Sequence, residues 1–148
     1  MKLAEALQER ADINHNIEQL KNRLNNNVLV QDGETTVEDP NKLKDNSIKR
    51  LQYLIARINQ TNCETSIDGE SITEIIAQKD ALSLKINIYK ETAFLASQLS
   101  YRARNSEIKI KSAISVTDWQ SEIDKMSKEL RLLDNKLQEN NWKTELIE

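Results

Sequence analysis

Large apolar residues recur every three or four positions along most of the chain. The clearest stripe has steps of four, three, four, three and four, and consists of Trp119, Ile123, Met126, Leu130, Leu133 and Leu137. This spacing places the six side chains along one narrow side of a helix, while the charged residues between them face water. Because a single helix cannot bury such a stripe, the pattern predicts partner helices from the same chain or from another copy.

The same rhythm predicts four long helices, at about 2–25, 40–62, 72–99 and 118–141. The third of these is apolar on two sides, and its second side carries Leu84, Ile88, Phe94, Leu95 and Leu99. A helix with apolar residues on two sides lies in the centre of a bundle or between subunits. We therefore expect the chain to form a homo-oligomer, with a hexamer as one candidate.

Short β elements are expected between the helices. Asp-Gly pairs at Asp32–Gly33 and Asp68–Gly69 predict two hairpins, at about 28–37 and 64–72, because Asp-Gly suits tight hairpin turns. Alternation of apolar and polar residues predicts a strand at about 107–116. The expected fold is mainly α: one domain over residues 1–148, built as a long-helix bundle of four helices with two short β-hairpins and one further strand.

Composition narrows the function classes. The chain has 148 residues with a net charge of -3, and aromatic residues make up only 4% of it. An acidic balance with few aromatics argues against nucleic-acid binding. The single cysteine fits a reducing compartment, the first residues carry charges where a signal peptide needs an apolar core, and no apolar run reaches the ~18–20 residues of a membrane span. We expect a cytoplasmic protein without a membrane span.

Candidate chemistry is sparse. His15 is the only histidine and Cys63 the only cysteine, so neither a zinc cluster nor a di-iron helix motif is present in the sequence. We therefore expect no catalytic residue, no metal and no cofactor, and the sequence leans against an enzyme. Arg102, Arg104 and Lys109 belong to a local basic group that is either a solvated face or an anion contact.

Several segments resemble a small bacterial family labelled septicolysin. They are Met1–Leu7, Arg10–Asp12, Asn25–Glu34, Glu38–Pro40, Ile55–Asn62, Ser106–Lys109 and Gln138–Leu146. The resemblance implies a helical, oligomer-forming protein, and its label suggests a cytolysin, but it brings no catalytic motif. The polar positions of the matching segments are the candidates for a site or a subunit contact: Arg57, Asn59, Asn62, Glu107 and Lys109.

Three functions remain open at this point. The first is a structural, scaffolding or interaction role without catalysis, in a protein whose partner is another copy of itself. The second is a membrane-active cytolysin, which rests on the family label alone. The third is a small-ligand binder or enzyme with a site at a subunit interface near Arg57, Asn59 and Glu107.

Overall fold

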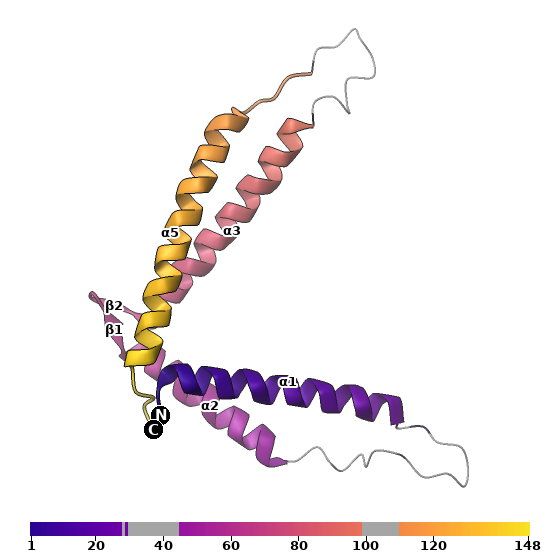
Figure 1. Ribbon diagram of the computed structural model, residues 1–148, viewed down its shortest axis with the longest axis vertical. Coiled ribbons are helices and arrows are strands. Elements are labelled where there is room, and N and C mark those ends of the chain that lie inside the picture. The colour runs from indigo at the N-terminus through magenta and orange to yellow at the C-terminus, as the bar shows by residue number, and fades with distance from the viewer. Residues whose placement is uncertain (28, 30–44, 99–109) are drawn as a thin grey trace. The chain divides into compact units, whose positions relative to one another are not determined.

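The structure, a computed structural model, describes residues 1–27, 29, 45–98 and 110–148 (Figure 1). Its elements are α1 (Leu3–Asn27), α2 (Asp45–Glu64), β1 (Ser66–Ile67), β2 (Glu70–Ser71), α3 (Ile72–Ser97) and α5 (Val116–Lys143). The described residues confirm the prediction of a mainly helical chain, and they contain four helices. The described residues form two compact units: Met1–Ser71 with Glu139–Glu148, here called the first unit, and Ile72–Gln138, the second unit. The single domain, the four-helix bundle and the oligomer stay predictions.

The first unit is built on the pairing of α1 with α2. Leu3 and Ala6 of α1 and Leu54 and Ile58 of α2 are at most 1% exposed. In α2 the buried residues are four apart, so they lie one above the other on the same side of the helix. Their burial is the main apolar contribution to this unit, at about 1.5–3 kcal/mol for each large side chain.

Main-chain hydrogen bonds join the two ends of the chain within the first unit. The Leu3 amide donates to the Thr144 carbonyl at 2.9 Å, and the Leu146 amide donates to the Met1 carbonyl at 2.8 Å. Lys2 and Glu145 form an antiparallel β-bridge between them. The last residues of the chain are therefore part of the fold, and Leu146 is 7% exposed.

The small sheet confirms the second predicted hairpin. β1 pairs antiparallel with β2, with Ser66 opposite Ser71 and Ile67 opposite Glu70. Asp68 (φ 54°) and Gly69 (φ 89°) form the two-residue connection, both in the left-handed region. Two consecutive residues with positive φ match the twist of the flanking strands, and Asp-Gly adopts them at low cost.

The second unit has a core made by α3 and α5. Ile86 and Ala93 of α3 cluster with Ile123 and Met126 of α5, and four partly buried residues pack against them: Leu82, Tyr89, Trp119 and Leu130. The Tyr89 and Trp119 rings stack with centroids 4.4 Å apart. The predicted stripe of α5 thus faces α3. Lys79, which interrupts the stripe of α3, forms an ion pair with Asp134 of α5.

The further strand expected at 107–116 is wrong where the structure describes it. Residues 110–115 have no strand, and α5 already begins at Val116. Ser115 caps this helix: its hydroxyl accepts a hydrogen bond from the Asp118 amide at 3.3 Å, which satisfies one of the free amides of the first turn. The alternation of apolar and polar residues therefore wrongly indicated a strand over residues 110–115. Residues 107–109 and the hairpin expected at 28–37, apart from residue 29, lie outside the described residues.

Candidate functional site

An exposed apolar surface of the second unit lies on α3. Six exposed residues of α3 follow one another in steps of four, three, four, three and four. We call them the outer seam: Ala77, Ala81, Leu84, Ile88, Glu91 and Leu95. Leu84 is 62% exposed, Ile88 52% and Leu95 57%. The outer seam therefore repeats the spacing of a helix-packing stripe without a partner helix among the described residues.

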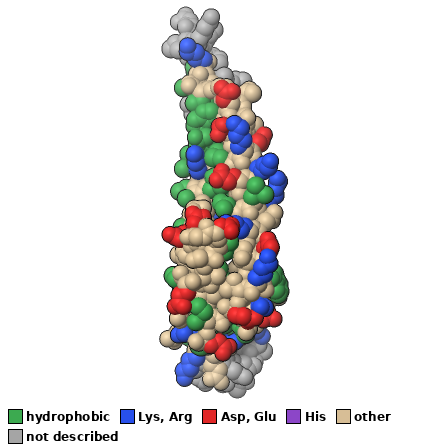
Figure 2. All heavy atoms as spheres, turned by 90° about the vertical axis from the view of Figure 1, so that its left-hand side faces the viewer, with side chains coloured by type: hydrophobic (Ala, Val, Ile, Leu, Met, Phe, Trp, Pro, Cys, Tyr) green, Lys and Arg blue, Asp and Glu red, His purple; other side chains and the backbone are tan. Residues whose placement is uncertain are grey.

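Geometry separates the outer seam from the core of the second unit. Leu84 and Ile88 lie two positions before and after the buried Ile86, and at 3.6 residues per turn each lies about 160° around the helix from it. One side of α3 thus faces α5, and Leu84 and Ile88 lie on the opposite side, while Ala81 at the flank borders a groove shared with Leu133 of α5. Figure 2 shows a column of hydrophobic side chains running along the α3–α5 pair, with Lys, Arg, Asp and Glu side chains beside it.

The first unit also has an open apolar surface, on α2. Ile48 and Ile55 are each 41% exposed, and together with Leu51, Gln52 and Ala56 they line a shallow groove of about 430 Å³. This groove, here called the α2 groove, lies beside the buried Leu54–Ile58 side of the helix. Aliphatic side chains with one flanking amide offer contact area to another apolar surface, but no group that could carry chemistry.

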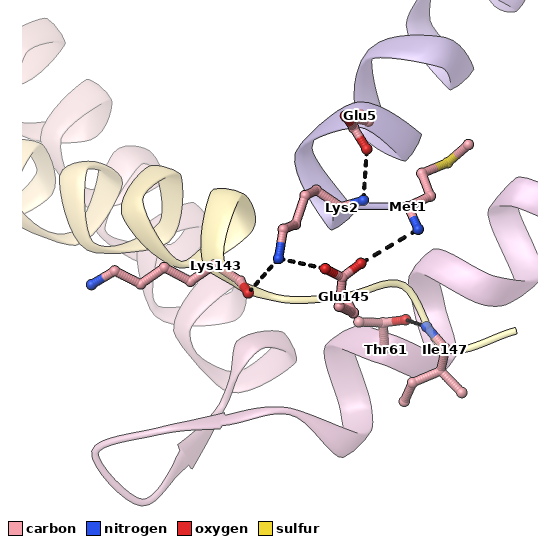
Figure 3. Close-up of polar contacts among 7 residues, drawn as sticks. All are labelled: Met1, Lys2, Glu5, Thr61, Lys143, Glu145 and Ile147. Atoms are coloured by element: carbon pink, nitrogen blue, oxygen red, sulfur yellow. Dashed lines mark hydrogen bonds and ion pairs between the residues drawn. The ribbon is translucent and has the colours of Figure 1, made fainter.

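Charged groups in the first unit gather around the chain termini (Figure 3). The Lys2 ammonium lies 2.5 Å from a Glu145 carboxylate oxygen and the Met1 amino group lies 3.4 Å from the other. The hydrogen bond from Lys2, reinforced by the amino terminus, lowers the pKa of Glu145 below its usual value. Lys2 also donates to the Lys143 carbonyl at 3.4 Å. Both positive groups share the one Glu145 carboxylate, so the cluster fastens the two ends of the chain to each other.

Thr61 links the C-terminal segment to α2. It is the one buried polar residue among those described, with 0% exposure. Its hydroxyl donates to the Arg57 carbonyl at 2.8 Å and accepts from the Ile147 amide at 3.0 Å, so both its donor and an acceptor position are used. No local pattern in the sequence indicates this contact, because Thr61 and Ile147 are 86 residues apart.

A second polar link joins α1 to α2. Arg50 donates from Nε to Oε1 of Glu9 at 2.7 Å and from its Nη2 to Oε2 at 2.8 Å. This two-pronged hydrogen bond lowers the pKa of the Glu9 carboxyl and raises that of Arg50. Bidentate pairing fixes orientation as well as charge, so the pair sets how the two helices align.

The structure does not gather the predicted site residues on one face. Arg57 is half-buried, donates to the Gln60 side chain at 2.9 Å and lies over the Tyr53 ring at 5.8 Å. Asn59 is exposed and lies two positions after Arg57, so it is on the opposite side of α2. Asn62 is on the same side of α2 as Asn59 and is half-buried. Glu107 and Lys109 lie outside the described residues. The site and its role stay a prediction.

Neither a metal-binding cluster nor a membrane-spanning helix is found among the described residues. Among the described residues there is no group of three or more His, Cys, Asp or Glu side chains placed to hold a metal ion. No helix within the described ranges is long and apolar enough to cross a membrane. The features that the described structure does provide are the two apolar surfaces on α2 and α3.

Comparison with known proteins identifies the family. A model described as a family of unknown function (DUF6847) matches residues 10–146. The chain belongs to this family. The chain is also similar to a solved structure: the crystal structure of a functionally unknown conserved protein from Corynebacterium diphtheriae shares 30% sequence identity with it, the match covers 99% of each chain, and the TM-score is 0.91. No curated protein matches the chain.

These matches correct the resemblance inferred from the sequence. The assignment to septicolysin is wrong, because the model that matches is that of the DUF6847 family and the structural relative carries no such label. The cytolysin hypothesis rested on that label alone and loses its basis.

Proposed function

We propose that this DUF6847 protein is a non-catalytic scaffolding protein that assembles with copies of itself through apolar helix faces. The outer seam of α3 carries the proposal: its large side chains are more than half exposed and keep the spacing of a helix-packing stripe. Exposed apolar stripes with this regularity are typical of surfaces that bind another protein.

The expected free energy of self-association follows from the apolar side chains that are exposed on α3. Burying a Leu, Ile or Phe fully is worth about 1.5–3 kcal/mol, so a side chain that is half exposed gains roughly 1 kcal/mol when it is covered. Leu84, Ile88, Phe94 and Leu95 are exposed by 52–62%, which gives about 8 kcal/mol over two copies. Association itself costs about 4–15 kcal/mol. The net gain is thus at most about 4 kcal/mol, and we expect weak, reversible assembly with a dissociation constant of about 1 mM.

Two separate surfaces on each chain favour assemblies larger than a dimer. If the outer seam joins one pair of copies, the α2 groove is left to join another pair. Two kinds of two-fold contact generate a closed assembly when their axes intersect at a suitable angle, and the hexamer expected from the sequence is one such assembly.

A cytoplasmic location without a nucleic-acid partner is part of the proposal. The single Cys63 suits a reducing compartment, and the net charge of -3 offers no electrostatic attraction for nucleic acid.

Small-ligand binding has less support. A pocket in the second unit has a volume of about 270 Å³ and is lined by apolar residues, such as Leu95 and Ile110, and by polar ones, such as Gln98 and Lys111. Ligand pockets usually measure about 300–1,000 Å³. The volume of this pocket therefore falls just below the usual range for a metabolite.

Sedimentation velocity with light scattering on the full chain tests the proposal. We expect the mean mass to rise reversibly between about 5 µM and 1 mM, as mass action requires for weak association. A single mass equal to the monomer over this range would refute self-assembly. A reaction product formed by the purified chain alone would refute the non-catalytic role.

A further inference from the structure

We infer that two copies of this protein pair through the outer seam of α3 as a parallel, in-register two-helix coiled coil. The inference rests on the proposed self-assembly and adds the surface, the direction and the register. The alternation of four- and three-residue steps assigns the seam to heptad positions, with Ala81, Ile88 and Leu95 at a and the remaining three members at d.

The apolar residues of the seam favour two parallel strands. Ile88 stands at a and Leu84 at d, and a β-branched residue at a with Leu at d favours a parallel dimer. Ala77 and Ala81 continue the seam towards the start of α3. Small side chains there allow the two helices to approach closely, so the whole stretch from Ala77 to Leu95 can remain in contact.

Charge beside the seam fixes the direction. The residues flanking it are Asp80, Asn87 and Phe94 at g, and Gln78, Lys85 and Thr92 at e. Only Asp80 and Lys85 are charged, and they have opposite signs. In a parallel pair, position g of one helix meets position e five residues later on the other. Asp80 of each copy would then face Lys85 of the other, which gives two ion pairs.

An antiparallel pair lacks this complementarity. If Leu84 of one copy faced Ile88 of the other, position e would meet position e, and Lys85 would face Lys85 across the symmetry axis. Within the described part of a single chain, neither Asp80 nor Lys85 forms an ion pair, and Lys85 lies 5.6 Å from the centre of the Tyr89 ring. Both charges are thus available to a second copy.

Glu91 explains why the pairing would be weak. It is the one charged member of the outer seam and stands at d, where the two copies would place like charges close together. A polar residue at such a position lowers stability while restricting the register. Replacing it with an apolar residue should therefore tighten the dimer, an effect that a surface residue outside an interface would not produce.

The first experiment measures self-association of the full chain by sedimentation equilibrium. Leu84→Glu should raise the dissociation constant at least tenfold, and Glu91→Leu should lower it at least tenfold. Leu132→Glu is the control, because Leu132 is 57% exposed on α5 and outside the seam. If Leu84→Glu and Leu132→Glu weaken association equally, or if Glu91→Leu has no effect, the seam is not the interface.

The second experiment tests direction by exchanging charges. Asp80→Lys and Lys85→Asp should each weaken association severalfold, because each places like charges opposite one another. The double variant should return to the original dissociation constant. A double variant that is as weak as Lys85→Asp alone would overturn the parallel arrangement.

The third experiment tests register with a covalent link. In a Cys63→Ser background, Ala81→Cys should form a disulfide with its counterpart under mild oxidation, whereas Lys90→Cys, which is exposed outside the seam, should not. In the antiparallel pair the two positions would be about 15 Å apart along the axis, too far for a disulfide. Equal cross-linking of both variants, or none at position 81, would overturn the inference.

These outcomes separate the inference from the proposed function. A chain that assembles normally while all seam variants behave like the parent would leave self-assembly in place and exclude the outer seam. A chain that stays monomeric at every concentration would exclude both.

Discussion

Replacing Thr61 with Val tests how far the C-terminal segment contributes to the first unit. Thr61 has 0% exposure and accepts the Ile147 amide hydrogen bond at 3.0 Å. Valine keeps the branched shape but has no acceptor, so the Ile147 amide loses its partner. The Arg57 carbonyl, to which Thr61 also donates, lies within α2, where the helix supplies a backbone donor.

The expected cost follows from the amide left without an acceptor. Leaving a buried donor unsatisfied costs about 1–3 kcal/mol, and Val recovers part of this because it buries a methyl group in place of a hydroxyl. We expect a loss of about 1.5–2 kcal/mol in the free energy of unfolding, or a roughly 10- to 30-fold change in the unfolding equilibrium constant. Thr61→Ser keeps the hydroxyl and should cost about 1 kcal/mol for the missing methyl group.

Two measurements report on the change. Urea unfolding followed by Trp142 fluorescence, with all variants in a Trp119→Phe background, reports on the first unit, to which Trp142 belongs. Hydrogen exchange at the Ile147 amide, followed by NMR, reports on the contact itself. We expect exchange to accelerate in Thr61→Val and to remain slow in Thr61→Ser.

Two outcomes would contradict the role assigned to the Thr61 hydroxyl. If Thr61→Val unfolds at the same urea concentration as the parent and its Ile147 amide stays protected, the side chain does not hold the C-terminal segment. If Thr61→Ser loses protection as completely as Thr61→Val, shape and not hydrogen bonding makes the contact.

Three further changes test the packing of each unit. Leu54→Ala should lower the free energy of unfolding by about 2–5 kcal/mol, since Leu54 is fully buried. Ile55→Ala, on the α2 groove, should lower it far less. Equal losses of stability in urea unfolding would contradict the assigned sides of α2. Glu9→Gln should destabilise the chain at about pH 7 but not at about pH 2. The contact with Arg50 lowers the pKa of the Glu9 carboxyl in the folded protein, so it stabilises the fold above the unfolded pKa of about 4.3. This stabilisation is lost as the pH falls through the folded pKa. A difference that persists at acid pH in thermal unfolding would argue against the Arg50 contact. Tyr89→Leu should cost about 1 kcal/mol beyond its lost area because it removes a ring stack, and unchanged near-ultraviolet dichroism would argue against that stack.

Periodicity in the sequence determined the helices and their apolar sides. The stripe of α5 and the two apolar sides of α3 follow from spacing alone, because residues three or four apart must lie on the same side of a helix. The hairpin at β1–β2 follows from Asp68–Gly69, since few other pairs tolerate two positive φ angles. The second apolar side of α3 also follows from spacing. The pairing proposed for Asp80 and Lys85 beside it follows only after the outer seam is assigned to heptad positions.

Tertiary structure decided which groups far apart in the sequence meet. Spacing places Trp119 on the stripe of α5 but cannot name Tyr89 as the ring that it contacts. The partners of Thr61, Lys2 and Glu145 are joined by the return of the C-terminal segment to the start of the chain. Local patterns record only the preferences of neighbouring residues, and a contact across the chain exists only after the backbone has brought its ends together. The strand expected at 107–116 shows the same limit, since in the described part of that range Ser115 caps α5 where alternation alone suggested a sheet.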